Sequence, residues 1–181
     1  MRTLAFFLIL STFLFSCAPN FTEEKKEVDD FNKILDKSDS LFFSIPKEDV
    51  YNRLNIYESN LNRIRENAPD SIDMEMSAIV NRCKLIKKPF KHFLGNYEKY
   101  RKEVDLSRDQ LNNLYHDLEI RVMKKDSFYY YLEMEKEYIV NLSNEMESNA
   151  KDVINLIKNF DTLNPLLEVK IKNIENSKKI E

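Results

Sequence analysis

The stretch 128-FYYYLEMEKEYIVNLSNEMESNAKDVINLIKNF-160 repeats apolar residues with a period of seven. One series occupies every seventh position, at Leu132, Ile139, Met146, Val153 and Phe160. The companion positions of the same heptads hold Phe128, Leu142 and Leu156. Glu135 and Asn149 interrupt the companion series, as single polar residues do where they fix the register of a coiled coil. The pattern predicts one long helix that starts at Asp126-Ser127 and packs along a continuous apolar seam.

The composition favours helices over every other architecture. The chain of 181 residues contains a single glycine, Gly95. Sheets, tight turns and phosphate-binding loops consume glycine, because it adopts positive φ without strain. A hydrophobic content of 43% is ordinary for a folded domain, and the length suits one domain. We therefore expect an all-α fold, an antiparallel helical bundle with long, coiled-coil-like helices.

Shorter apolar stripes predict the helices that precede the long one. The first covers residues 28–42, and the second runs to residue 67, with Ser44 as its N-cap and a proline in its first turn. A third stripe, over 72–100, keeps its phase on both sides of Pro89. A proline inside a helix breaks or kinks it. Because the phase is preserved, we favour one kinked helix over two.

Capping signals set the remaining boundaries. Ser107 followed by Gln110 is a capping-box pattern, which predicts that a new helix begins there and buries apolar residues over 111–122. Asn164-Pro165 is expected to end the long helix, because the residue before a proline is driven out of helical geometry. A short last helix would then cover 167–174.

Residues 1–16 have the pattern of an export signal. Arg2 precedes an apolar run over 4–15, which is too short to cross a hydrocarbon core of about 30 Å. Leu14-Phe15-Ser16-Cys17 resembles the lipobox of bacterial lipoproteins. In that family the cysteine thiol takes a diacylglycerol, a peptidase cuts before the cysteine, and the new amine is acylated. The resemblance implies that Cys17 is the lipid attachment site and the mature N-terminus. A transmembrane anchor is the alternative.

These signals divide the chain into four segments. Residues 1–16 are the expected signal peptide, 17–27 a lipidated tether, 28–176 the helical bundle and 177–181 a frayed C-terminus. Loss of the signal removes one basic residue and moves the formal net charge from −3 to −4. The charges are mixed along the chain, whereas nucleic-acid binding needs a clustered basic surface, so no nucleic-acid partner is expected.

Candidate chemistry is sparse. His116 and Glu119 share a helix face, but a carboxylate-bridged metal bundle needs a Glu-x-x-His pattern on two helices, and His92 has no acidic neighbour in sequence. Cys83 lies on the third stripe and is expected to be a buried hydrophobe. Nucleophile elbows and phosphate loops both need glycine turns, which Gly95 cannot supply alone. We predict no catalytic, cofactor-binding or metal-binding residues and no enzymatic activity.

Two surface features remain open. The cluster Phe128-Tyr129-Tyr130-Tyr131 with Tyr138 cannot face one core completely, so at least one ring should be exposed, either over a neighbouring helix or as a binding surface. Three tripeptides resemble the Asp-Ser/Thr-aliphatic O-glycosylation motif of Bacteroidota, although Asp and Ser also cap helices: Asp39-Ser40-Leu41, Asp70-Ser71-Ile72 and Asp161-Thr162-Leu163.

The segment 106–166 resembles small uncharacterised helical lipoproteins of Bacteroidota. The resemblance rests on Leu111-Leu114-Asp117-Leu118, Tyr131-Glu135 and Asn164-Pro165. It implies a lineage and a cell-envelope location, and Ala18 after the cysteine resembles outer-membrane sorting. We expect a membrane contact through the N-terminal lipid and a protein partner in the envelope, hence an interaction or scaffold protein. The alternative is a small-ligand or metal-binding lipoprotein with a pocket near His92 or His116.

Overall fold

The computed structural model describes residues 21–68 and 72–178. Within these ranges the chain forms helices and no strand, which confirms the predicted all-α bundle. The helices are α2 (Thr22–Phe43), α3 (Lys47–Asn67), α4 (Met74–Lys84), α5 (Lys87–Glu119) and α6 (Lys125–Lys178).

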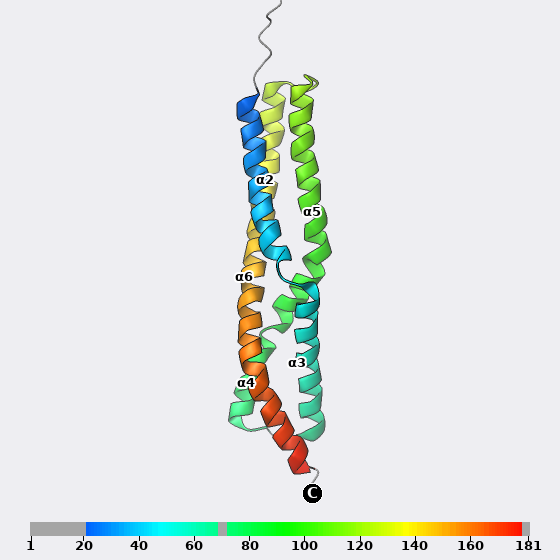
Figure 1. The fold of residues 1–181 in the computed structure, drawn as a ribbon, viewed down its shortest axis with the longest axis vertical. Coiled ribbons are helices and arrows are strands. Elements are labelled where there is room, and N and C mark those ends of the chain that lie inside the picture. Colours follow the sequence, from blue (N-terminus) through cyan, green and yellow to red (C-terminus); the bar gives the residue numbers. More distant parts are fainter. Residues whose placement is uncertain (1–20, 69–71, 179–181) are drawn as a thin grey trace, which may run out of the picture.

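The helices form three legs of an elongated bundle (Figure 1). The first leg, α2 and then α3, runs down the bundle, and the second leg, α4 and then α5, returns to the top. The third leg is α6 alone, which runs the full length and packs against each of the other four helices. Consecutive legs are antiparallel, as predicted. The first and third legs are parallel, because two reversals separate them.

The apolar seam of α6 is buried as predicted. All five residues of the strict heptad series are at most 3% exposed, as is Phe128 of the companion series. Asn149 and Leu142 of that series are also buried, whereas Leu156 and Glu135 are partly exposed. One helix therefore supplies a continuous apolar surface to all the others.

The predicted end of this helix at Asn164-Pro165 was wrong, because α6 continues through Pro165 to Lys178. A proline inside a helix leaves the carbonyl four residues earlier, here that of Asp161, without its usual donor, and this costs about 3 kcal/mol. The buried stripe nevertheless continues without a slip across the proline, through Phe160, Leu163, Leu167 and Ile171. Tertiary packing on both sides therefore outweighs the local penalty.

Pro89 divides the predicted third helix. The expectation of one kinked helix was wrong, since α4 ends at Lys84 and α5 begins at Lys87. Pro89 has no N–H to donate to the carbonyl of Leu85, and its ring crowds that carbonyl. Leu85 and Ile86 both keep right-handed helical dihedrals, so the apolar stripe holds its phase across the break.

The predicted helix start at Ser107 was also wrong. Ser107 lies inside α5, fully buried, and its hydroxyl has no hydrogen-bond partner. The reason is that Ser107 occupies a core position of a stripe that runs through Tyr100, Val104 and Leu111. Packing therefore carries the helix through a local capping pattern. Val122, expected to be buried, lies in the turn after α5 and is 76% exposed.

The junction between α2 and α3 differs by two residues from the expectation. Ser44 is not the N-cap of α3: it follows the last residue of α2, and its hydroxyl donates to the carbonyl of Leu41 at 2.7 Å. Pro46 takes the N-cap position instead, with an extended backbone. Ile45 between them is buried, which anchors the junction to the core.

The first helix begins at Thr22, earlier than the predicted Val28, so part of the expected tether is helical. Glu24 in its first turn is completely buried. Its carboxylate forms an ion pair with Lys125 and accepts a hydrogen bond from the hydroxyl of Tyr129 at 3.2 Å. The start of α2 is therefore fixed to the start of α6.

Aromatic rings fill the middle of the bundle. The ring of Phe42, at the end of α2, lies 4.6 Å from that of Phe93 and 5.1 Å from that of Tyr100, centroid to centroid. Phe43 packs edge-on against Tyr97 at 4.9 Å. This aromatic cluster joins the end of the α2 segment to α5, where the first leg changes from α2 to α3.

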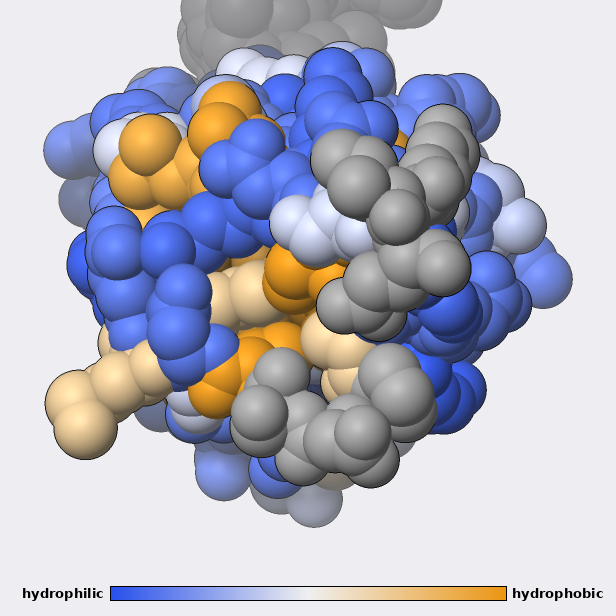
Figure 2. All heavy atoms as spheres, turned by 90° about the horizontal axis from the view of Figure 1, so that it is seen from below, coloured by the Kyte–Doolittle hydropathy of each residue, from blue (hydrophilic) through white to orange (hydrophobic). Residues whose placement is uncertain are grey.

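Charged residues surround the lower end of the bundle. Figure 2 shows apolar side chains at the centre of this end within a hydrophilic rim. Arg63 on α3 pairs with Glu168 and Glu175 on α6, at 2.7 and 2.8 Å. Lys170 on α6 pairs with Asp73 at the start of α4. These contacts hold the ends of α3 and α4 against α6 beyond Pro165.

Ser107→Ala should stabilise the protein. The buried hydroxyl of Ser107 makes no hydrogen bond, so its removal relieves a desolvation cost, and we expect a gain of about 1 kcal/mol in urea unfolding. The matched control is Ser38→Ala, since the buried hydroxyl of Ser38 contacts that of Ser143 at 3.2 Å. That variant should lose about 1 kcal/mol. Equal losses in the two variants would contradict the assignment.

Glu24→Gln should lower the melting temperature at neutral pH and have little effect in acid. Burial by itself raises the pKa of Glu24, but hydrogen bonds from Lys125 and Tyr129 together with the charge of Lys125 bring it below its ordinary value of 4.5. A depressed pKa in the folded state gives stability that is present above 4.5 and lost as the pH falls through the folded value. Thermal unfolding of both proteins across this range tests the prediction. A difference that persists unchanged in acid would refute it.

Candidate functional site

A groove of about 480 Å³ lies between α5 and α6 near the middle of the bundle. Residues from both helices line it: Lys88, Pro89, His92, Tyr100, Glu145, Ser148, Asn149 and Asp152. The break at Leu85-Ile86 sets the direction of α5 just before these residues, so the same proline that ends α4 lies in the wall of the groove.

A hydrogen bond between His92 and Asn149 crosses the groove. The amide nitrogen of Asn149 lies 2.7 Å from Nδ1 of His92. Where the amide donates to Nδ1, the neutral imidazole carries its proton on Nε2. Asn149 is only 9% exposed and stands at a core position of the α6 seam. This cross-helix bond explains why the heptad series has a polar residue there.

Tyr100 forms the buried end of the groove. It is 2% exposed, and its hydroxyl lies 3.5 Å from a carboxylate oxygen of Glu145, which is a long contact. Burial raises the pKa of Tyr100, and the negative charge of Glu145 raises it further. The phenol is therefore a neutral hydrogen-bonding group at physiological pH. The groove offers donors, acceptors, the two carboxylates of Glu145 and Asp152 and the ammonium group of Lys88, but no activated nucleophile.

The other candidate side chains that the sequence offers are far apart in the structure. His116 lies in the last turn of α5, away from His92, and the described residues contain no group of three His, Cys, Asp or Glu side chains placed to hold a metal. Cys83 is 1% exposed, which confirms the predicted burial, and this burial raises the pKa of its thiol. Its thiol is thus shielded and protonated.

The aromatic cluster of α6 divides between core and surface, which confirms the prediction that at least one ring is exposed. Phe128 is buried and Tyr129 is partly buried against Glu24. Tyr130, Tyr131 and Tyr138 are between 43% and 64% exposed. These three rings therefore lie on the surface, beside a core that already contains Phe128.

An apolar patch lies across α5 and α6. The hydroxyl of Tyr138 faces Glu103, and Tyr131 lines a shallow hollow with Gln110, which fixes the antiparallel register of the two helices. In that register Leu106 is level with Glu135, the residue next to Met134, and Leu106 and Met134 are both more than half exposed. We call Leu106, Tyr131, Met134 and Tyr138 the α5–α6 patch. A cluster of exposed aromatic, Met and Leu side chains is typical of protein-binding surfaces.

The tripeptides that resemble glycosylation motifs have structural partners where they are described. Asp39 pairs with Arg108 at 3.3 Å, and Asp161 with Arg53 at 2.8 Å. The hydroxyl of Thr162 donates to a backbone carbonyl of its own helix. Asp70-Ser71 lies outside the described residues. Helix contacts thus account for the described aspartates of these motifs, while Ser40 stays exposed.

The lipobox and Cys17 also lie outside the described residues. None of the helices in the described ranges is long and apolar enough to cross a membrane. The chain matches no protein-family model, no curated protein and no solved structure.

Sequence reasoning found only part of the groove. The sequence marks His92 as a candidate and Asn149 as a break in the heptad series. It does not predict that the two side chains are in contact, because that depends on how α5 packs against α6. Tyr100 was assigned to the apolar stripe alone. A polar residue at a seam position is the signal that could have pointed to this place, because such a residue needs a partner on the facing helix.

Proposed function

We propose that the protein is a cell-envelope lipoprotein, anchored by lipid on Cys17 and most consistent with the outer membrane, that acts without catalysis as an interaction or scaffold module. The anchor rests on the resemblance of Leu14-Cys17 to a lipobox behind an apolar run of signal-peptide length. Lipid chains contribute about 0.8 kcal/mol for each buried CH₂ group, so several chains hold a protein on a membrane durably.

The α5–α6 patch is the observation that supports the proposed role in protein interaction. Its four side chains are between 43% and 58% exposed, and the register described above places them on neighbouring faces of α5 and α6. Behind them α6 is one continuous helix that contacts each of the other four helices. A partner would therefore meet a preformed surface and would pay little to order it.

Cys17→Ser should abolish incorporation of a fatty-acid probe and move the protein from the detergent phase to the aqueous phase. The reason is that serine cannot form the thioether to diacylglycerol. Cys83→Ala is the matched control, because it removes the other cysteine, which is buried, and should leave labelling unchanged. Persistent labelling of the Cys17→Ser protein would show that the lipid lies elsewhere.

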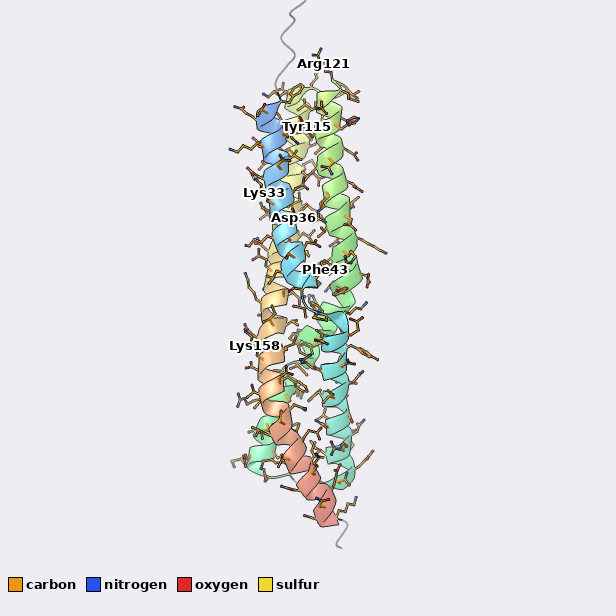
Figure 3. The ribbon with its side chains drawn as sticks, in the orientation of Figure 1. Lys33, Asp36, Phe43, Tyr115, Arg121 and Lys158 are labelled. Atoms are coloured by element: carbon orange, nitrogen blue, oxygen red, sulfur yellow. The ribbon has the colours of Figure 1, made fainter. Side chains whose placement is uncertain are left out.

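A photo-crosslinking amino acid at Met134 should give one discrete adduct in intact cells. The same amino acid at Lys158, exposed on the same helix outside the patch, should give none (Figure 3). Tyr131→Ser combined with Tyr138→Ser should remove most of the adduct at Met134, because aromatic anchors dominate such contacts. Adducts of equal yield at both positions, or none at Met134 in the lipidated protein, would argue against a binding role for the patch.

A second candidate function is the binding of a small ligand in the groove. The observation that favours it is the combination of a hollow of about 480 Å³ with the His92–Asn149 bond and the neutral Tyr100 phenol. A polar molecule with both donors and acceptors fits such a lining. A mass retained by the purified protein in native mass spectrometry would favour this class over the scaffold.

A further inference from the structure

The turn between α5 and α6 lies at the same end of the bundle as the start of α2 (Figure 1). Two contacts place them together: Glu24 pairs with Lys125, and Lys25 lies 5.4 Å from the ring centre of Tyr115. With a rise of about 1.5 Å per residue, α5 extends beyond Tyr115 about as far as α2 extends back from Lys25 to Phe21. The turn and the first described residue are therefore level.

The chain between Cys17 and Phe21 is very short. Four residues span at most about 14 Å when fully extended. If Cys17 carries the lipid, as proposed above, this end of the bundle must face the bilayer at close range. The turn over 120–124 is then the part of the described chain, apart from the start of α2, that comes nearest to the membrane.

The turn has an apolar tip. Ile120 is 53% and Val122 is 76% exposed, and neither belongs to the hydrophobic core of the described residues. In most helix ends of this kind the apolar residue that follows the left-handed position packs back on the helix, but Val122 does not. Two exposed branched side chains on either side of Arg121 therefore point away from the core.

Arg121 has a backbone conformation that suits glycine. Its φ is +61°, whereas no other described residue that is not glycine has a positive φ. The amides of Arg121 and Val122 donate to the carbonyls of Leu118 and Asp117, at 3.1 and 3.0 Å, which is the Schellman pattern of a helix end. The Schellman motif requires this left-handed backbone, but glycine is the residue that adopts it without strain, so an arginine here carries a conformational cost.

Arg121 supplies an exposed cationic side chain, which a glycine at the same position would not. Figure 3 shows it at the outer end of the bundle, beyond the last turn of α5 and the first turn of α6. It forms no ion pair or side-chain hydrogen bond within the described ranges, and the same is true of Lys124 three residues later. Both cations are exposed and available to an anion outside the protein.

We propose that the α5–α6 turn is a second membrane contact, in which Ile120 and Val122 enter the headgroup region and Arg121 binds a phospholipid phosphate. Arginine matches phosphate because its planar guanidinium donates two parallel hydrogen bonds. Glu119 and Asp126 are exposed nearby, so the turn is not a basic cluster. The proposed contact is therefore a hydrogen-bonded pair of Arg121 with one phosphate group, and not a general attraction to a negatively charged surface. The proposal rests on the lipid at Cys17, which keeps a weak contact at high local concentration.

The test uses the lipidated mature protein in vesicles of phosphatidylethanolamine and phosphatidylglycerol. A fluorophore is attached at Glu119→Cys, beside the contact, or at Ser177→Cys at the far end of α6, each with Cys83→Ala. A spin-labelled phospholipid should quench most of the emission from position 119 and leave that from position 177 unchanged. Absence of quenching at 119 in protein that still floats with the vesicles would overturn the proposal. Protein that does not float would instead mean that the lipid anchor is wrong.

Variants separate the contact from folding. Ile120→Ser combined with Val122→Ser should restore most of the emission at position 119 without loss of flotation. The matched control is Ile56→Ser with Val169→Ser, a pair of exposed apolar residues near the opposite end, which should leave quenching intact. Arg121→Gly relieves the backbone strain, so it should not lower the melting temperature, yet it should reduce quenching. A fall in melting temperature with unchanged quenching would mean that Arg121 is purely structural.

Discussion

The structure depends on one uninterrupted helix. Each of the other described helices packs against α6, and none of them reaches both ends of the bundle. The two legs that pack on it are both broken, at Ser44-Ile45-Pro46 and at Leu85-Ile86, so neither could align the two halves. The seam of α6 can do so, because its heptad series keeps one phase on both sides of Pro165.

Polar pairs between legs fix the register that apolar contacts leave open. Buried apolar side chains attract without direction, so a seam alone permits sliding by a heptad. Four directional contacts at different heights of α6 prevent this: Tyr129 with Glu24, Ser143 with Ser38, Asn149 with His92, and Asn164 with Asn60. A slip would leave the buried members of these pairs without partners, at a cost of roughly 1–3 kcal/mol for each buried group. The buried members are Glu24, Ser38, Asn60, Ser143 and Asn149.

The same geometry separates the proposed functions along the molecule. The proposed membrane contact lies at the upper end, where α2 begins and α5 turns into α6. The α5–α6 patch lies below it on the side of the rod, and the groove at His92 lies lower still. A protein partner at Met134 could thus be bound while the turn at Arg121 faces lipid, since different parts of the surface carry the two contacts.

The sequence by itself determined the fold class, the seam of α6 and the burial of Cys83, because these follow from composition and from periodicity within single segments. It failed at Ser107, Pro89 and Pro165, where local capping and breaking rules compete with burial of the neighbouring stripe. Whether the helix continues or breaks at these positions is determined by tertiary packing, through contacts such as that of Asn60 with Asn164. It also joined His92 to Asn149 and brought Arg121 level with the start of α2, because residues far apart in sequence meet only when the legs pack together.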